Sequence, residues 1–242
     1  MFSNKGGAGR SMLASNLAVL LAERSTEPVA LVDADLQFGD LAVMLKLAPD
    51  HTIADLAGAA GPFTEEQVRS RLTTHGPSGL LVLAAPLEPA YADQIGTADL
   101  RRILMALRVF CEFVIVDTPA YLSDVVLDLL EGSDDVVLVA GMDIPHLKDV
   151  RISVQTLRLM QFPIDRVHLV INRSDSKVRL DAADVERTLE LKAVCSIPSD
   201  IVVTQSINAG TPVVTDAPRS GVARAIAQLA DRFLPSAAPT SR

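Results

Sequence analysis

The sequence has few of the residues that bind polyanions, cross-link secreted chains or span membranes. Its 22 Lys and Arg residues are outnumbered by 30 Asp and Glu residues, and the net charge of −8 provides no general basic field for nucleic acid or anionic lipid. Cys111 and Cys195 are far apart and in no CxxC array, which favours reduced core residues. No uninterrupted apolar run reaches the ~18 residues of a membrane-spanning helix. These absences predict a soluble, cytoplasmic protein.

Hydrophobic residues make up 49% of the 242-residue chain, enough for one large core. We expect buried strands at residues 29–32, 80–84, 113–116, 136–140, 167–171 and 193–197. We expect helices at residues 11–24, 98–110, 125–130, 146–160, 181–191 and 222–233. We also expect a loop and short helix at 36–47, a helical region at 52–60 with 65–73, and a helical turn at 201–208. This alternation predicts an α/β fold with a doubly wound, mostly parallel sheet and helices on both faces. We predict one domain, residues 1–234, and a disordered tail, residues 235–242.

Residues 4–11 (NKGGAGRS) predict a phosphate-binding loop in front of a buried helix. Three glycines in four residues permit positive φ angles and let backbone N–H groups approach an anion, and the helix N-terminus adds partial positive charge. The loop departs from the pattern G-x-x-x-x-G-K-[ST] at Asn4 and Arg10. A buried strand normally precedes such a loop, and only three residues do so here, so we expect a truncated first strand.

Polar side chains follow three of the expected strands. Asp33 and Asp35 follow the first strand, Asp117 follows the third, and Asn172 and Arg173 follow the fifth. Ligands of open parallel sheets bind at the carboxyl ends of the strands. Asp33 and Asp117 could instead cap the segments that come after them. Two such strands beside a phosphate-binding loop favour a Mg²⁺ site.

Residues 5–11 (KGGAGRS) resemble the deviant Walker A loop of the ParA/MinD ATPases. Four further stretches follow in the family's order. Residues 31–35 resemble its second aspartate motif, 114–119 its Walker B strand, 170–173 its base-recognition strand, and 197–200 with 208–212 its C-terminal signature. Residues 33–40 and 85–89 look most like the CpaE/TadZ branch, which assists assembly of Flp (tight-adherence) pili. The resemblance implies a P-loop NTPase fold of the SIMIBI, MinD-like type.

The resemblance also implies roles for individual residues, with ATP or ADP and Mg²⁺ as cofactors. Asp35 would orient the attacking water, and Lys5 would reach across a nucleotide-sandwich homodimer to the partner's phosphates. Asn172, followed by Arg173, would read the adenine edge, and Pro198 would lie near the base. The residues expected to hold the phosphates are Lys5, Gly6, Gly7, Ala8, Gly9, Arg10, Ser11 and Met12. Those expected at Mg²⁺ are Ser11, Asp33 and Asp117.

Two departures from the family pattern put catalysis in doubt. Lys5, Arg10 and Asp35 are the expected catalytic residues for hydrolysis of ATP to ADP and phosphate. The planar guanidinium of Arg10 is larger than an ammonium and cannot act as a compact charge between two phosphates. Met12 lacks the hydroxyl that usually helps to hold the α-phosphate. Losing a transition-state contact of this kind costs ~10² to 10³ in rate, so binding could survive where hydrolysis does not.

The leading functional hypothesis is a nucleotide-dependent switch ATPase that positions or assists assembly of a pilus or secretion machine. The alternatives are a non-hydrolysing scaffold of the same fold and a chromosome- or septum-positioning ATPase. Basic residues are sparse and residues 235–242 offer no apolar helix face, so the sequence predicts neither specific nucleic-acid binding nor a direct membrane anchor. Partner proteins would then recruit the chain to the cell pole or the inner membrane face. The partner, and the presence of an upstream receiver-like domain, stay open.

Overall fold

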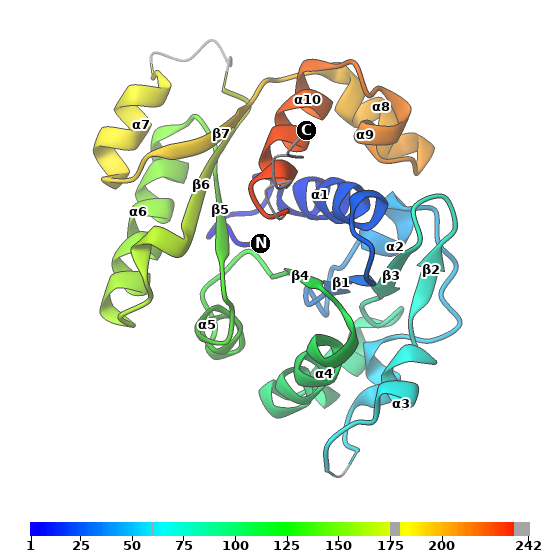
Figure 1. Ribbon diagram of the computed structural model, residues 1–242. Helices are drawn as coiled ribbons and strands as arrows, with labels where there is room; N and C mark the ends of the chain where they lie inside the picture. The colour runs from blue at the N-terminus through cyan, green and yellow to red at the C-terminus, as the bar shows by residue number, and fades with distance from the viewer. Residues whose placement is uncertain (60, 175–179, 235–242) are drawn as a thin grey trace, which may run out of the picture.

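The computed structural model describes residues 1–59, 61–174 and 180–234 as an α/β fold (Figure 1). Its strands are β1 (Val29–Asp33), β2 (Thr73–His75), β3 (Leu80–Leu83), β4 (Phe113–Asp117), β5 (Val136–Ala140), β6 (Val167–Asn172) and β7 (Ala193–Ile197). Its helices are α1 (Arg10–Arg24), α2 (Leu41–Met44), α3 (Glu65–Arg69), α4 (Thr97–Phe110), α5 (Asp124–Glu131), α6 (Ile144–Leu159), α7 (Ala182–Leu189), α8 (Ile201–Ala209), α9 (Val213–Asp216) and α10 (Gly221–Asp231). Short 3₁₀ helices occupy Ile53–Leu56, Pro89–Gln94 and Ile164–Arg166.

The strands run in the order β2-β3-β1-β4 and β5-β6-β7, and every pairing is parallel except that of β2 with β3. Residues 1–3 lie between β4 and β5 and connect the two sheets (Figure 1). The Met1 amine donates to the carbonyl of Val116 at 2.8 Å. On the other side, the Phe2 N–H donates to Val137 at 2.9 Å and the Val139 N–H donates to Phe2 at 2.8 Å.

Helices cover both faces of the connected sheets, because alternate residues of each strand point to opposite sides. Val29 and Leu31 of β1 belong to the core that α1 and α10 share. Ala30 and Val32 belong to the core beneath α4, while α6 and α7 cover β5 and β6 on that same side. Residues 12–21 of α1 are all buried, as in a helix enclosed by neighbours all round. The predicted doubly wound architecture is therefore confirmed.

The structure corrects two expectations about local elements. Residue Thr73 was expected in a helix, but α3 ends at Arg69 and Thr73 begins the edge strand β2, which turns back through Gly79 to pair with β3. The helix expected over residues 52–60 was also wrong, because the described residues 52–59 form only the 3₁₀ turn Ile53–Leu56. Helix α9 and the turn Pro89–Gln94 were not predicted. The tail at residues 235–242 lies outside the described residues.

The described part of the chain contains no helix with the length and apolar character needed to cross a membrane.

Candidate functional site

The loop in front of α1 has the backbone geometry of an anion-binding turn. Gly7 and Gly9 adopt left-handed φ angles of 77° and 87°, which other residues rarely adopt. Gly9 is the N-cap of α1 and brings no side chain to the first-turn N–H groups. Those groups have no intrahelical acceptor, as at any helix start, and they carry the positive end of the helix dipole. Gly6 and Gly7 are exposed and Ala8 is buried, so the loop presents its backbone outward.

Asn172, at the end of β6, ties the loop to the sheet. Its Nδ2 donates to the carbonyl of Ala8 at 2.7 Å, and its Oδ1 accepts from the Arg173 N–H at 3.0 Å. A Cβ atom at Gly9 would collide with the Asn172 amide, so this contact requires glycine. The Asn172 amide is thus paired within the protein, and base reading by it stays a prediction. Arg173 is exposed, and Pro198 is half-buried against Gly221.

Asp33 and Asp117 lie side by side at the carboxyl ends of β1 and β4. The two residues are paired in register across the strands, and each is only 1% exposed. Asp33 accepts hydrogen bonds from the backbone N–H groups of Leu41 at 3.1 Å and Asp35 at 3.3 Å. Burial raises the pKa of Asp33 to about 8, and the nearby Asp117 charge adds to the rise while the two backbone hydrogen bonds oppose it. The expected juxtaposition of the two carboxyls is therefore present.

The Asp117 carboxyl offers an oxygen to a cation. Burial raises the pKa of Asp117, whereas the nearby Ser11 hydroxyl and Arg10 guanidinium lower it. Its Oδ1 is buried and makes no hydrogen bond within the described part of the chain. The described residues contain no group of three or more His, Cys, Asp and Glu side chains placed so that together they could hold a metal ion. One hydroxyl with one or two carboxylates fits Mg²⁺, which takes few protein ligands and completes its shell with phosphate oxygens and water.

Arg10 points beneath the loop, toward the carboxyl groups. Its side chain is 8% exposed, and Nη1 donates to the carbonyl of Ser3 at 3.2 Å. Nη2 lies 3.7 Å from Asp35 Oδ2, and Nε lies 3.6 Å from Asp117 Oδ1. Neither Nε of Arg10 nor Oδ1 of Asp117 has a hydrogen-bond partner among the residues that the structure describes. The Arg10 guanidinium was expected at the phosphates. It is directed instead at Asp35, which was expected to orient water, and at Asp117, which was expected to bind Mg²⁺.

Lys5 lies at the opposite, exposed side of the loop. Its Nζ is 3.4 Å from Oδ1 of Asp143, and both side chains are well exposed, so the pair is weak. Asp143 also caps α6 by accepting from the His146 N–H at 2.9 Å. The buried His146 ring lies 3.2 Å from the Ser3 hydroxyl, and burial lowers its pKa.

Asp143 and His146 are site residues that the sequence analysis missed. The available signal was Asp143 itself, a third carboxylate shortly after a buried strand. Met12, expected at the α-phosphate, is buried in the core around α1. Ser11 remains partly exposed at the start of α1 beside Asp117. The arrangement could therefore hold a phosphate group on backbone N–H groups and a divalent cation next to it.

Comparison with known proteins gives consistent results. The family model for the CobQ/CobB/MinD/ParA nucleotide binding domain matches residues 1–213. An uncharacterized ATP-binding protein of Methanocaldococcus jannaschii is 29% identical over 236 residues, which cover 96% of this chain and 85% of that protein. A ParA family ATPase from Chlorobium tepidum has a similar structure, with a TM-score of 0.88, 24% identity and coverage of 95% and 96% of the two chains. For MinD from Pyrococcus horikoshii, complexed with Mg-ADP, the TM-score is 0.83 at 23% identity, with coverage of 96% and 93%. The chain belongs to the CobQ/CobB/MinD/ParA family of nucleotide-binding domains.

Proposed function

We propose that the protein binds ATP with Mg²⁺ at residues 5–11 and dimerises on the nucleotide, so that nucleotide state switches its interactions. The observation that carries this proposal is the loop itself, whose first-turn N–H groups lie near the Ser11 hydroxyl and the Asp117 carboxyl. Family membership and the Mg-ADP bound to a MinD of similar fold support it.

Each side chain has a role in this proposal. The N–H groups of residues 6–12 hold the phosphates, and the Ser11 hydroxyl and Asp117 hold Mg²⁺, with Asp33 beside them. Bound Mg²⁺ neutralises phosphate charge and polarises the phosphate oxygens. Asp35, which is partly exposed next to this pair, orients the attacking water. Asn172 and Pro198 lie at the carboxyl ends of β6 and β7, where the base would be held.

Arg10 governs how far the site hydrolyses ATP. Its guanidinium is close to the carboxyls of both Asp35 and Asp117, so it competes with water and Mg²⁺ for the groups that catalysis needs. We therefore propose weak ATP hydrolysis that resets the switch slowly. A scaffold that binds nucleotide without hydrolysis is the second candidate, and the same two contacts favour it.

Exposed apolar side chains surround the site edge and suit a second copy of the chain. They lie in loops or helix starts after β1, β3, β4 and β5, whose carboxyl ends share one edge: Phe38, Leu87, Tyr91, Tyr121 and Ile144. Large apolar side chains exposed together on one edge favour an interaction site there. Lys5 is on the same edge, and its one ion pair among the described residues is the exposed contact with Asp143, so it can reach toward a facing copy.

Two cellular structures could be what the switch positions. The resemblance of residues 33–40 and 85–89 to the CpaE/TadZ branch favours a pilus or secretion machine, with recruitment to the cell pole by partner proteins. The relatives described as septum site-determining MinD proteins favour the positioning alternative. ATP-dependent cosedimentation with anionic vesicles or salt-sensitive binding to DNA would support positioning. Loss of surface pili on deletion of the gene, with neither kind of binding, would support the pilus role.

The switch is tested by three measurements on one set of proteins. We expect ATP, and not ADP, to shift the chain from monomer to dimer in light scattering, with slow phosphate release. Asp117→Ala should abolish both effects, whereas the exposed Asp165→Ala should change neither. Tight ATP binding without phosphate release would favour the scaffold, and absence of nucleotide binding would refute both candidates.

A further inference from the structure

His146, in the first turn of α6, contacts the segment that leads into the phosphate-binding loop. Its side chain is buried, and Nε2 lies 3.2 Å from the hydroxyl oxygen of Ser3, which is also buried. Burial lowers the pKa of His146, so at neutral pH the ring is uncharged and has one donor and one acceptor nitrogen. The Ser3 hydroxyl can donate or accept, so the contact forms with either arrangement of the ring proton. It joins the start of the loop to a helix 143 residues away in the chain.

Side chains anchor the loop to the rest of the protein. Phe2 pairs with β5 through both its N–H and its carbonyl. Within the described chain, no backbone hydrogen bond joins residues 3–8 to another element. The far end of the loop is anchored by the Asn172 amide, and its start is anchored by the contact between Ser3 and His146. Loss of either contact would therefore leave one end of the loop free to move.

The other contacts near the start of the loop cannot replace His146. Arg10 Nη1 donates to the Ser3 carbonyl at 3.2 Å, but Arg10 is the first residue of α1, directly after the loop. That bond ties the two ends of the loop to each other and not to the surrounding elements. Lys5 pairs with Asp143, but the pair is exposed and therefore weak. His146 thus makes the buried contact that fixes the start of the loop to α6.

The His146 ring is itself held in one place. One carboxylate oxygen of Asp143 accepts from the His146 N–H at 2.9 Å, and the other lies 3.7 Å from Nδ1. Gly141 passes close to the ring, since a Cβ atom there would lie only 2.7 Å from Nδ1. Asp143 therefore fixes the turn of helix from which the ring projects, and the missing side chain at Gly141 leaves space for the ring.

We propose that His146 is a positioning residue for nucleotide binding, because it fixes the start of the phosphate-binding loop through Ser3. This rests on the proposed function, in which the N–H groups of residues 6–12 hold the phosphates. These groups bind a phosphate only when they converge on it, so the apparent affinity falls with the fraction of molecules whose loop has that conformation. Release of Ser3 lowers this fraction, although His146 itself touches neither the nucleotide nor Mg²⁺.

Two substitutions at His146 separate its contact with Ser3 from the rest of the ring. His146→Gln places an amide near the position of Nε2 and keeps the contact. His146→Asn is one carbon shorter, places its amide near the position of Nδ1 and loses the contact. In calorimetry we expect about tenfold weaker ATP binding for the Asn variant and a change of less than about twofold for the Gln variant. Equal losses of affinity in the two variants would overturn the proposal.

Ser3→Ala removes the same contact from the other side. It should also weaken ATP binding about tenfold, and the double variant with His146→Asn should bind no more weakly than either single variant. Native affinity in Ser3→Ala, or additive losses in the double variant, would overturn the proposal.

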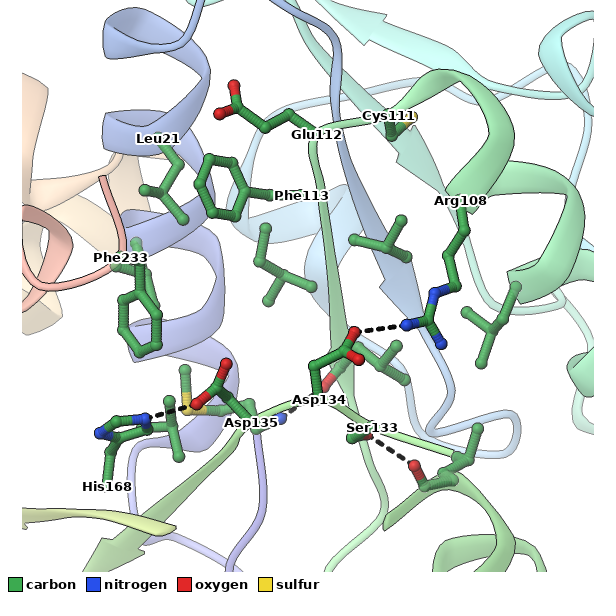
Figure 2. A pocket seen from close by; sticks show the side chains of 18 of the residues that line it. Leu21, Arg108, Cys111, Glu112, Phe113, Ser133, Asp134, Asp135, His168 and Phe233 are labelled. Atoms are coloured by element: carbon green, nitrogen blue, oxygen red, sulfur yellow. Dashed lines mark hydrogen bonds and ion pairs between the residues drawn. The ribbon is translucent and has the colours of Figure 1, made fainter. Parts of the chain in front are cut away.

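Two similar contacts at the amino ends of the parallel strands, opposite the loop, supply matched controls. Figure 2 shows His168, near the amino end of β6, with its ring directed at Asp135, and Nε2 lies 2.8 Å from that carboxylate. Nδ1 of the buried His75 lies 2.7 Å from the hydroxyl of Ser78, just before β3. His168→Asn and Ser78→Ala lose these contacts and should keep native ATP affinity. Weaker binding in the controls would show a general effect of lost stability and would overturn the proposal.

Backbone amide relaxation, measured by NMR without nucleotide, tests the positioning role separately from the proposed function. In His146→Asn we expect the order parameters of residues 4–8 to fall from about 0.85 to about 0.6 or below, with no change in His168→Asn. Unchanged order parameters in the His146 variant would overturn the positioning role, even if the native protein binds ATP. Failure of the native protein to bind ATP would refute the proposed function, and the order parameters would still decide whether His146 fixes the loop.

Discussion

The Nε atom of Arg10 lies 3.6 Å from Oδ1 of Asp117, both atoms are buried, and neither has a hydrogen-bond partner in the described structure. The pair therefore has the charge of an ion pair without its hydrogen bond. Breaking such a buried pair on one side leaves an uncompensated charge, whereas replacing both partners together is far less harmful. This pair links folding stability to the chemistry of the site.

Arg10→Lys should increase ATP turnover. A lysine side chain places one compact ammonium where the guanidinium now contacts Ser3, Asp35 and Asp117. The carboxyls become available to water and Mg²⁺, and we expect a gain of about 10² in single-turnover phosphate release. The conservative control is Arg24→Lys at the exposed end of α1, which should leave turnover unchanged. An Arg10 variant that binds ATP and turns it over at the original rate would contradict this explanation.

Arg10 and Asp117 should be coupled in stability. In a double-mutant cycle of Arg10→Met and Asp117→Asn, we expect each single variant to lower the free energy of unfolding by about 3 kcal/mol. The double variant should recover part of that loss, with a coupling of about 1 to 3 kcal/mol. Urea unfolding without nucleotide measures all four proteins. Additive effects would mean that the two side chains do not interact across the 3.6 Å that separates them.

Much of the fold was predictable because buried parallel strands are apolar runs between helical segments. Strand β1 (Val29–Asp33) was predicted to within one residue for that reason. The edge strand β2 was missed because Thr73–His75 is too short to show alternation and depends on its pairing with β3.

The site was predictable only as a set of residues, without its internal contacts. Asp33 and Asp117 were expected together because each ends a strand, and their pairing in register confirms it. The direction of Arg10 and the bond from Asn172 to Ala8 depend on contacts between distant parts of the chain, the latter across 164 residues. No local pattern in the sequence encodes such contacts.

The free energy of unfolding of the nucleotide-free protein should fall as pH rises, because the pKa of Asp33 is raised in the folded chain. Its pKa is about 8 in the folded chain and 3.8 in the unfolded chain, so between these values the folded state holds the extra proton. The free energy of unfolding therefore decreases between about pH 4 and pH 8, by at most about 1.4 kcal/mol per pH unit, and then levels off. Asp33→Asn keeps an acceptor for the Leu41 N–H and does not titrate. Urea unfolding from pH 5 to 9 should show this slope in the difference between the two proteins, and parallel profiles would contradict it.

Gly9→Ala should destabilise the loop more than the same change at Gly58. Both glycines have positive φ angles, 87° and 68°, so alanine is strained at either site. A Cβ at Gly58 meets open space, whereas at Gly9 it collides with the Asn172 amide that holds Ala8. We expect an excess loss of about 1 to 3 kcal/mol for Gly9→Ala in thermal unfolding, with loss of ATP affinity for that variant alone. Equal losses of stability in the Gly9 and Gly58 variants would contradict the proposal that Asn172 holds the loop in place.

Lys5→Met should separate dimerisation from folding. The ion pair of Lys5 with Asp143 is exposed, and such pairs contribute about 0 to 1 kcal/mol, so the unfolding temperature should hardly change. ATP affinity should fall only modestly, because the N–H groups of residues 6–12 still face the phosphates. The ATP-dependent dimer should be lost, because the lysine would no longer reach the nucleotide of the facing copy. Lys148→Met, on the exposed face of α6, is the matched control and should dimerise normally. If the Lys5 variant dimerises as well as this control, Lys5 acts within its own chain, and the exposed apolar loops at the site edge hold the two copies together without it.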